Sequence, residues 1–291
     1  SIVSAQLSSD VSSIFSTASA FAALKDDGSV ITWGNSSNGA DSSSVSHQLS
    51  SGVTQIFSTR QSFAALKDDG SVVTWGDGSA ANASTVAPSL TSGVSQIFTT
   101  PDAFAALKDD GSVITWGNYG GDSSSVSADL SSGVVQITSN ERSFAALKDD
   151  GSVVTWGGFA IGADSAALSS GVSQISATGA VFAALKDDGS VIAWGHSSPD
   201  YGGDISSVSD QLMSGVSQIF SNRHSFAALK DDGSVITWGD SNNGGDSYSV
   251  SNELSSGVSQ IFSTYKAFAA LKDDGSVVTW GNPTDGGDSS Y

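Results

Sequence analysis

The segment from Phe63 to Val72 has the sequence Phe-Ala-Ala-Leu-Lys-Asp-Asp-Gly-Ser-Val, and these ten residues occur seven times without a substitution. The copies start at Phe21, Phe63, Phe104, Phe144, Phe182, Phe226 and Phe268. An Asp-Gly pair between two apolar runs predicts a tight β-hairpin, because glycine readily adopts the positive φ that closes such a turn. Each copy is therefore expected to be a hairpin of the same repeating unit.

The rest of the unit also has strand signals. A tryptophan follows each hairpin, and successive tryptophans are 38 to 44 residues apart. In the second unit, Val53 to Phe57 is rich in β-branched and aromatic residues and predicts a first strand, and residues 63–67 and 71–75 form the hairpin strands. A weaker fourth strand is expected after each Trp-Gly pair and its variable loop, as in residues 44–49 of the first unit, which precede the turn Ser50-Ser51-Gly52.

Four antiparallel strands in a unit of about 42 residues are typical of a β-propeller blade. We therefore predict an all-β chain in which residues 1–291 form a single closed propeller of seven four-stranded blades. The segment Ser1 to Leu7 aligns with residues 43–49 and is expected to be a strand that completes the last blade. Such closure would remove two exposed sheet edges.

The repeated Asp-Gly-x-Val-x-x-Trp-Gly motif, preceded by Val-Ser-Gln-Ile and followed by a Gly-containing loop, resembles the regulator of chromosome condensation repeat family over essentially the whole chain. The resemblance implies a seven-bladed propeller. The nearly identical units also resemble those of the long bacterial repeat proteins of this family. It also implies guanine nucleotide exchange, which in that family uses an inserted β-wedge and a basic tail. The chain has no insertion or basic arm of that kind, so the fold alone carries over.

The units differ mainly in two loops. The first holds a pair of residues that changes in every unit, just before the invariant phenylalanine, and the second follows each Trp-Gly. Because consecutive strands of a meander alternate in direction, both loops should lie on one side of the sheets, and the constant Asp-Asp-Gly turns on the other. The four cations outside the hairpin lysines, Arg60, Arg142, Arg223 and Lys266, all lie in the variable pairs.

This contrast predicts a binding face on the variable side, since loops on a rigid scaffold often carry recognition and Tyr and Arg are frequent at binding hot spots. The alternative interpretation is that these loops merely tolerate change. The second loop set also offers Phe159, His196 and Tyr248. The predicted binding residues are Arg60, Gln61, Asp102, Glu141, Arg142, Arg223, His224, Tyr265, Lys266, Tyr119 and Tyr201.

Composition excludes several function classes. With 30 acidic and 11 basic residues the net charge is −19, which disfavours nucleic acid and anionic membranes as partners. The absence of cysteine excludes disulfides and thiol chemistry. The Asp-Asp pairs are best explained by turn chemistry, and His47, His196 and His224 by incidental positions without metal-ligand spacing. Calcium at the Gly-Gly-Asp loops of Asp122, Asp204, Asp246 and Asp288 is a weaker alternative.

We therefore expect a monomeric, non-enzymatic module without a cofactor or a metal site. It should bind a protein or a glycan outside the cell or at the cell surface. A structural spacer within a longer repeat protein is an alternative from another class, and a nucleotide exchange factor is a third. The sequence does not identify the ligand.

Overall fold

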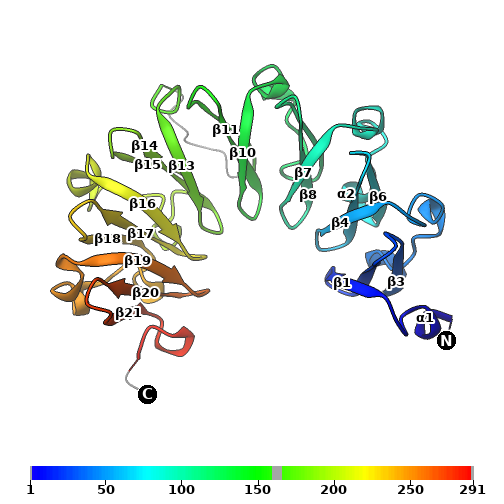
Figure 1. Cartoon of the computed structure of the whole chain (residues 1–291). Coiled ribbons are helices and arrows are strands. Elements are labelled where there is room, and N and C mark those ends of the chain that lie inside the picture. Colours follow the sequence, from blue (N-terminus) through cyan, green and yellow to red (C-terminus); the bar gives the residue numbers. More distant parts are fainter. Residues whose placement is uncertain (1, 159–165, 290–291) are drawn as a thin grey trace. The chain divides into compact units, whose positions relative to one another are not determined.

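A computed structural model describes residues 2–158 and 166–289 of the chain, and in these residues it shows seven three-stranded antiparallel sheets (Figure 1). The first strands of the sheets are β1 (Val11–Ser16), β4 (Val53–Ser58), β7 (Val94–Thr99), β10 (Val134–Ser139), β13 (Val172–Ala177), β16 (Val216–Ser221) and β19 (Val258–Ser263). The middle strands are β2 (Ala20–Lys25), β5 (Ser62–Lys67), β8 (Ala103–Lys108), β11 (Ser143–Lys148), β14 (Val181–Lys186), β17 (Ser225–Lys230) and β20 (Ala267–Lys272). The outer strands are β3 (Val30–Gly34), β6 (Val72–Gly76), β9 (Val113–Gly117), β12 (Val153–Gly157), β15 (Val191–Gly195), β18 (Val235–Gly239) and β21 (Val277–Gly281).

The predicted hairpin is confirmed in register and in turn chemistry. In the second repeat, Phe63 lies opposite Trp75 across the β5–β6 pair, and their rings stack with centroids 5.2 Å apart. Gly70 closes the turn with a φ of +73°. The Asp69 carboxylate accepts a hydrogen bond of 2.9 Å from the backbone N–H of Ser71. The turn residues thus satisfy their own backbone groups locally.

The chain divides into two compact units. The first consists of Ser1–Phe144 and Trp156–Gly158, and the second of Ala145–Thr155 and Phe159–Tyr291. Within each unit, neighbouring repeats share apolar cores, which cover the middle strands from both faces. Phe63 and Ala65 of β5 pack with residues of β2, whereas Ala64 and Leu66 pack with residues of β8. The alanines of the repeated motif therefore bring successive sheets into close contact.

The expected fourth strand is absent from the described repeats, and helical turns take its place. Residues 43–45 form a 3-10 turn, in which the Asp41 carboxylate accepts from the backbone N–H of Ser43. Leu49 is then buried at the end of the segment. Asp and Ser side chains that bond nearby backbone groups favour such turns over a ladder, which explains why the prediction of a strand was wrong. The helical turns of these segments are α2 (Gly78–Ala81), η1 (Ser36–Asn38), η2 (Ser43–Val45, the turn just described), η3 (Ala87–Leu90), η4 (Ser124–Val126), η5 (Asp129–Ser131), η6 (Pro199–Tyr201), η7 (Ser209–Leu212), η8 (Ser241–Asn243), η9 (Tyr248–Val250), η10 (Glu253–Ser255) and η11 (Pro283–Asp285).

The N-terminal segment is also helical, as α1 (Ile2–Gln6), so the prediction that it is a strand of the last blade is wrong. Its alignment with the connecting segments is nevertheless correct. The Lys25 ammonium donates to the backbone carbonyl of Gln6, just as Lys67 donates to that of Gln48. The N-terminal segment therefore has the same relation to its hairpin as a connecting segment has.

The constant turns join each repeat to the next one. The Val53 N–H donates to the Gly28 carbonyl (3.0 Å), and the Asp68 N–H donates to the Gly52 carbonyl (2.9 Å). A Cβ atom on Gly70 would lie 2.7 Å from the backbone nitrogen of Gly93 in the following repeat. The invariance of the glycine at Gly70 thus has a packing cause.

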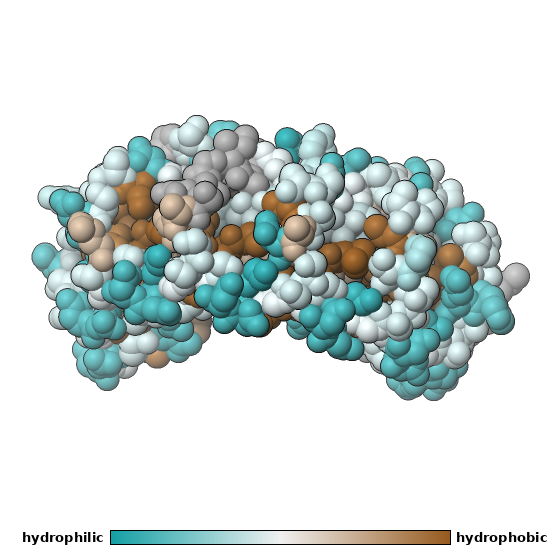
Figure 2. Space-filling model, turned by 90° about the horizontal axis from the view of Figure 1, so that it is seen from above, coloured by the Kyte–Doolittle hydropathy of each residue, from teal (hydrophilic) through white to brown (hydrophobic). Residues whose placement is uncertain are grey.

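In the described residues, no helix is long and apolar enough to cross a membrane. Figure 2 shows one face of the molecule, on which apolar residues (brown) lie between hydrophilic ones (teal).

Candidate functional site

Each variable pair sits in a turn that is held by the residue just before it. In the second repeat the Thr59 hydroxyl accepts from the backbone N–H of Ser62 (3.1 Å), and in the fourth repeat the Asn140 side chain accepts from those of Arg142 and Ser143. Thr and Asn are suited to such turns because their short side chains reach the backbone two or three residues on. These turn residues, which the sequence analysis missed, are Thr17, Thr59, Thr100, Asn140, Thr178, Asn222 and Thr264.

The two variable loops of a repeat lie side by side, as the alternation of strand direction predicted. The Asp77 N–H, just after β6, donates to the Gln61 carbonyl (3.1 Å), and the Asp240 N–H donates to the His224 carbonyl (3.2 Å). The Thr178 hydroxyl donates to the carbonyl of Tyr201 in the second loop (3.0 Å). Both loops of one repeat therefore form one surface.

Backbone hydrogen bonds also connect the variable pairs of successive repeats. In the first unit the Ala18 N–H donates to the Arg60 carbonyl (3.0 Å), and the Arg60 N–H donates to the Pro101 carbonyl (2.8 Å). In the second unit the Gly179 N–H donates to the Arg223 carbonyl (2.8 Å). These bonds use main-chain atoms alone, so the side chains can differ between repeats without loss of the contact.

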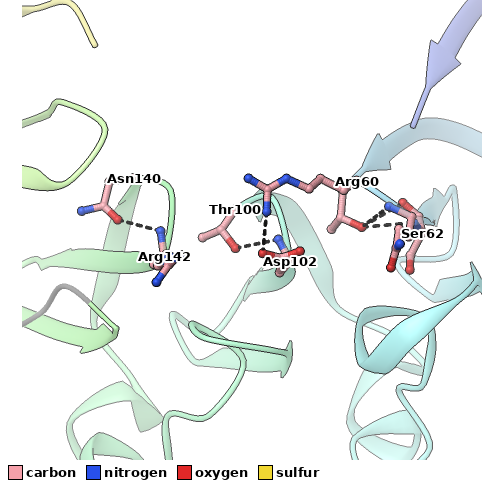
Figure 3. A network of polar contacts seen from close by, with 8 residues as sticks. Arg60, Ser62, Thr100, Asp102, Asn140 and Arg142 are labelled. Carbon is pink, nitrogen blue, oxygen red and sulfur yellow. Dashed lines mark hydrogen bonds and ion pairs between the residues drawn. The ribbon is translucent and has the colours of Figure 1, made fainter. Parts of the chain in front are cut away.

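The variable residues of the first unit form a polar group, which we call the Arg60 cluster: Arg60, Gln61, Asp102, Tyr119, Glu141 and Arg142. The Arg60 guanidinium reaches Asp102 of the next repeat at 3.0 Å, and the two side chains are 61% and 26% exposed (Figure 3). The Arg142 guanidinium carbon lies 4.9 Å from the centre of the Tyr119 ring. Gln61 and Asp102 line a small depression of about 20 Å³, which is room for about one water molecule.

The variable residues of the second unit form a row of rings, which we call the aromatic cluster: His196, Tyr201, Arg223, His224, Tyr265 and Lys266. The Tyr201 and His224 rings stack with centroids 5.8 Å apart, and the edge of His224 meets Tyr265 at 5.9 Å. His196 contacts Tyr201 edge to face at 5.8 Å. The cluster joins the loops of three successive repeats.

Two cations lie on the same ring of this cluster. The Arg223 guanidinium carbon is 5.3 Å and the Lys266 ammonium 5.8 Å from the centre of the Tyr265 ring. Tyr265 is 53% exposed, whereas the pair Gly179-Ala180, two repeats earlier, is small and buried. Cation–π contacts of this kind hold long side chains in place at a solvent-facing position.

The predicted binding residues thus come together as two groups, one in each unit. His196, which the sequence suggested to be incidental, belongs to the aromatic cluster. Tyr248 is 85% exposed and its backbone N–H donates to Asp246. Phe159 lies outside the described residues.

The acidic residues have structural partners instead of metal-like groupings. The Ser124 and Ser206 N–H groups donate to the carboxylates of Asp122 and Asp204, and hydrogen bonds from these serines lower the pKa of both carboxyls. Among residues 2–158 and 166–289, no three His, Asp or Glu side chains lie where they could hold a metal ion.

No protein-family model matches the chain, and no curated protein matches it either. Among solved structures it is similar to the ectodomain of the Arabidopsis thaliana receptor kinase ACR4, with 14% identity over 94% of this chain and 97% of that chain, and a TM-score of 0.44. It is also similar to human WBSCR16 (18% identity, 81% and 77% covered, TM-score 0.44) and to Saccharomyces cerevisiae Prp20p (17%, 79% and 72%, TM-score 0.42). Likenesses this distant carry no inference about function.

Proposed function

We propose that the chain is a non-enzymatic recognition module, which binds a protein or glycan partner through its two variable-loop clusters. The observation that supports this proposal most is the gathering of the unlike side chains. Residues that differ in every repeat contact one another across repeats, as Arg60 does Asp102 and His224 does Tyr265. Aromatic residues and arginines that cluster at an exposed surface are typical of binding hot spots.

The structure of the loops also suits recognition. The Thr or Asn turns and the main-chain bonds between repeats fix the backbone, whatever the side chains are. A preorganised backbone lowers the conformational entropy that binding must overcome. The side chains of the pairs can therefore differ to fit a partner while the scaffold stays the same.

The experiment compares two substituted chains with the wild type. One carries alanine at nine variable residues: Arg60, Gln61, Asp102, Glu141, Arg142, Arg223, His224, Tyr265 and Lys266. The matched control carries alanine at exposed glutamines of the first strands: Gln55, Gln96, Gln136, Gln218 and Gln260.

Partners selected on the wild-type chain from a displayed peptide library and a glycan array should bind the control and not the loop variant. Melting temperatures should stay similar, because the variable side chains carry few contacts of the core. A loop variant that still binds every selected partner would overturn the proposal and favour a structural spacer.

Further parts of this proposal rest on the sequence alone. We place the module outside the cell or at its surface because it is acidic, rich in serine and free of cysteine. A single closed domain of seven repeats, a monomeric state and membership of the regulator of chromosome condensation repeat family stay predictions.

A further inference from the structure

We infer that the aromatic cluster binds an acidic peptide segment of a partner protein, with its Asp or Glu carboxylates at Arg223 and Lys266. This inference rests on the proposed function and names the ligand of one of its two clusters. Three observations support it: the variable pairs of this unit are basic, both cations contact the Tyr265 ring, and the faces of the rings are in contact with one another.

The two clusters differ in charge. In the Arg60 cluster the variable pairs place Asp102 and Glu141 among the cations, and Asp102 is paired with Arg60. In the second unit the variable pairs are Gly179-Ala180, Arg223-His224 and Tyr265-Lys266, so their charged members are all basic. The variable pairs of this unit thus carry only positive charge on a chain of net charge −19, while the acidic residues near them, Asp200, Asp240 and Asp285, belong to the second loops.

A neighbouring acidic residue is already engaged elsewhere. Asp240 follows β18 and lies next to this surface through its bond to the His224 carbonyl. Its carboxylate accepts from the Asn242 N–H at 2.9 Å and from the Asn243 side chain. Asp240 thus serves as the cap of η8.

Both cations lie within 5.8 Å of the centre of the Tyr265 ring, so one ligand segment can reach both. The ring contacts orient the two side chains before a ligand arrives, which reduces the entropy lost on binding. A carboxylate would gain charge-assisted hydrogen bonds from the guanidinium and the ammonium. Clusters of basic side chains are a recurring way to recognise acidic motifs.

The arrangement of the rings favours a peptide over a sugar. Tyr201 and His224 stack on each other, and the Tyr265 ring carries the two cations, so these faces are already in contact. A pyranose that stacks on an aromatic residue needs an open ring face. Ring edges, hydroxyls and imidazole nitrogens instead suit the side chains and main chain of a peptide.

The test uses labelled ten-residue peptides rich in glutamate, in glutamine or in lysine, with fluorescence polarisation as the readout. The full chain should bind the glutamate peptide at least tenfold more tightly than the other two. R223A/K266A should lose this preference, whereas K67A/K108A, which removes two cations of the constant turns, should keep it. R223K/K266R should restore much of the binding, since it preserves both charges.

Equal binding of the three peptides, or an equal loss in K67A/K108A, would overturn the inference. If polygalacturonate binds more tightly than the glutamate peptide, and R223A/K266A abolishes that binding, the ligand of the cluster is an acidic glycan and the inference of a peptide is overturned. A library-selected partner that is lost in the nine-residue alanine variant but still binds R223A/K266A would leave the recognition module standing and overturn the acidic ligand alone.

Discussion

The indole Nε1 of Trp75 donates a hydrogen bond of 3.0 Å to the backbone carbonyl of Gly39, 36 residues earlier in the chain. The same bond recurs from Trp116 to Ala80 and from Trp238 to Gly202. Trp156 and Trp280 make it too, so these five tryptophans tie their own sheets to the connecting segment of the preceding repeat. The acceptor always lies 36 residues before the tryptophan, so the changes in repeat length fall between each Trp-Gly pair and the next acceptor.

Trp75→Phe should lower the free energy of unfolding by about 2 kcal/mol, because it leaves the buried Gly39 carbonyl without its indole donor. Phe keeps a ring beside Phe63 but is smaller, so a cavity adds to the loss. Urea unfolding followed by circular dichroism measures the change. Ser37→Ala, at an exposed position of the same connecting segment, should change stability by less than about 0.5 kcal/mol. Equal effects of the two substitutions would contradict the structural role of the indole bond.

The turn glycines allow the contact between repeats to be separated from backbone strain. Gly70 and Gly275 occupy the same turn position, with φ of +73° and +82°. A Cβ on Gly70 would meet the Gly93 nitrogen at 2.7 Å, whereas a Cβ on Gly275 would meet nothing within 4 Å. Gly275→Ala should therefore cost about 1 kcal/mol for the positive φ. Gly70→Ala should cost about 1–3 kcal/mol more, because main-chain atoms must move. Similar urea midpoints for the two variants would show that the joint between repeats is loose.

The Arg60–Asp102 ion pair should add little to stability. Arg60 is 61% exposed, so water and salt screen the pair. A double-mutant cycle with R60A, D102A and R60A/D102A should give a coupling of about 0.5 kcal/mol or less, falling further in 1 M NaCl. A coupling above about 1.5 kcal/mol would mean that the pair holds the loops together and is not mainly a surface for a partner.

Much of the fold could be predicted from the sequence, because the hairpin is specified by local chemistry. Asp69, Gly70 and the opposed Phe63 and Trp75 determine a turn and a register within thirteen residues. The alternation of strand direction was also sufficient to bring both variable loops to one surface.

Other features depended on contacts that no local pattern encodes. Residues 44–49 were expected to be a strand, but the bond from the Ser43 N–H to the Asp41 carboxylate and the burial of Leu49 favour a helical turn. The sequence also does not show that Gly70 packs against Gly93 of the next repeat, a contact that restricts this turn position to glycine. The pairing of Arg60 with Asp102 joins residues 42 apart and could not be inferred from spacing.

The constant turns should make the protein sensitive to acid. A hydrogen bond from the Ser112 hydroxyl, joined by that from its N–H, lowers the pKa of the Asp110 carboxyl, and the serines of the other six turns act alike on their aspartates. The folded state then binds fewer protons than the unfolded state near the ordinary Asp pKa. The stabilisation is therefore complete above the unfolded pKa of about 3.9 and is lost as the pH falls through the lower folded value.

Alanine at five turn serines tests this dependence: Ser112, Ser152, Ser190, Ser234 and Ser276, whose hydroxyls each donate to an aspartate at 2.6 Å. The urea midpoint of this variant should lie below that of the wild type at pH 7, and this difference should narrow as the pH falls below about 3.9, where the aspartates of the unfolded chain become protonated. The matched control replaces five serines that donate to main-chain carbonyls: Ser46, Ser127, Ser131, Ser251 and Ser255. Its gap from the wild type should stay constant with pH, because its acceptors do not titrate. Relief of the net negative charge at low pH affects all three chains alike and cancels in these differences. If the difference in urea midpoint between the turn variant and the wild type stays the same from pH 7 to pH 3, the hydrogen bonds from the serines to the aspartates do not stabilise the protein.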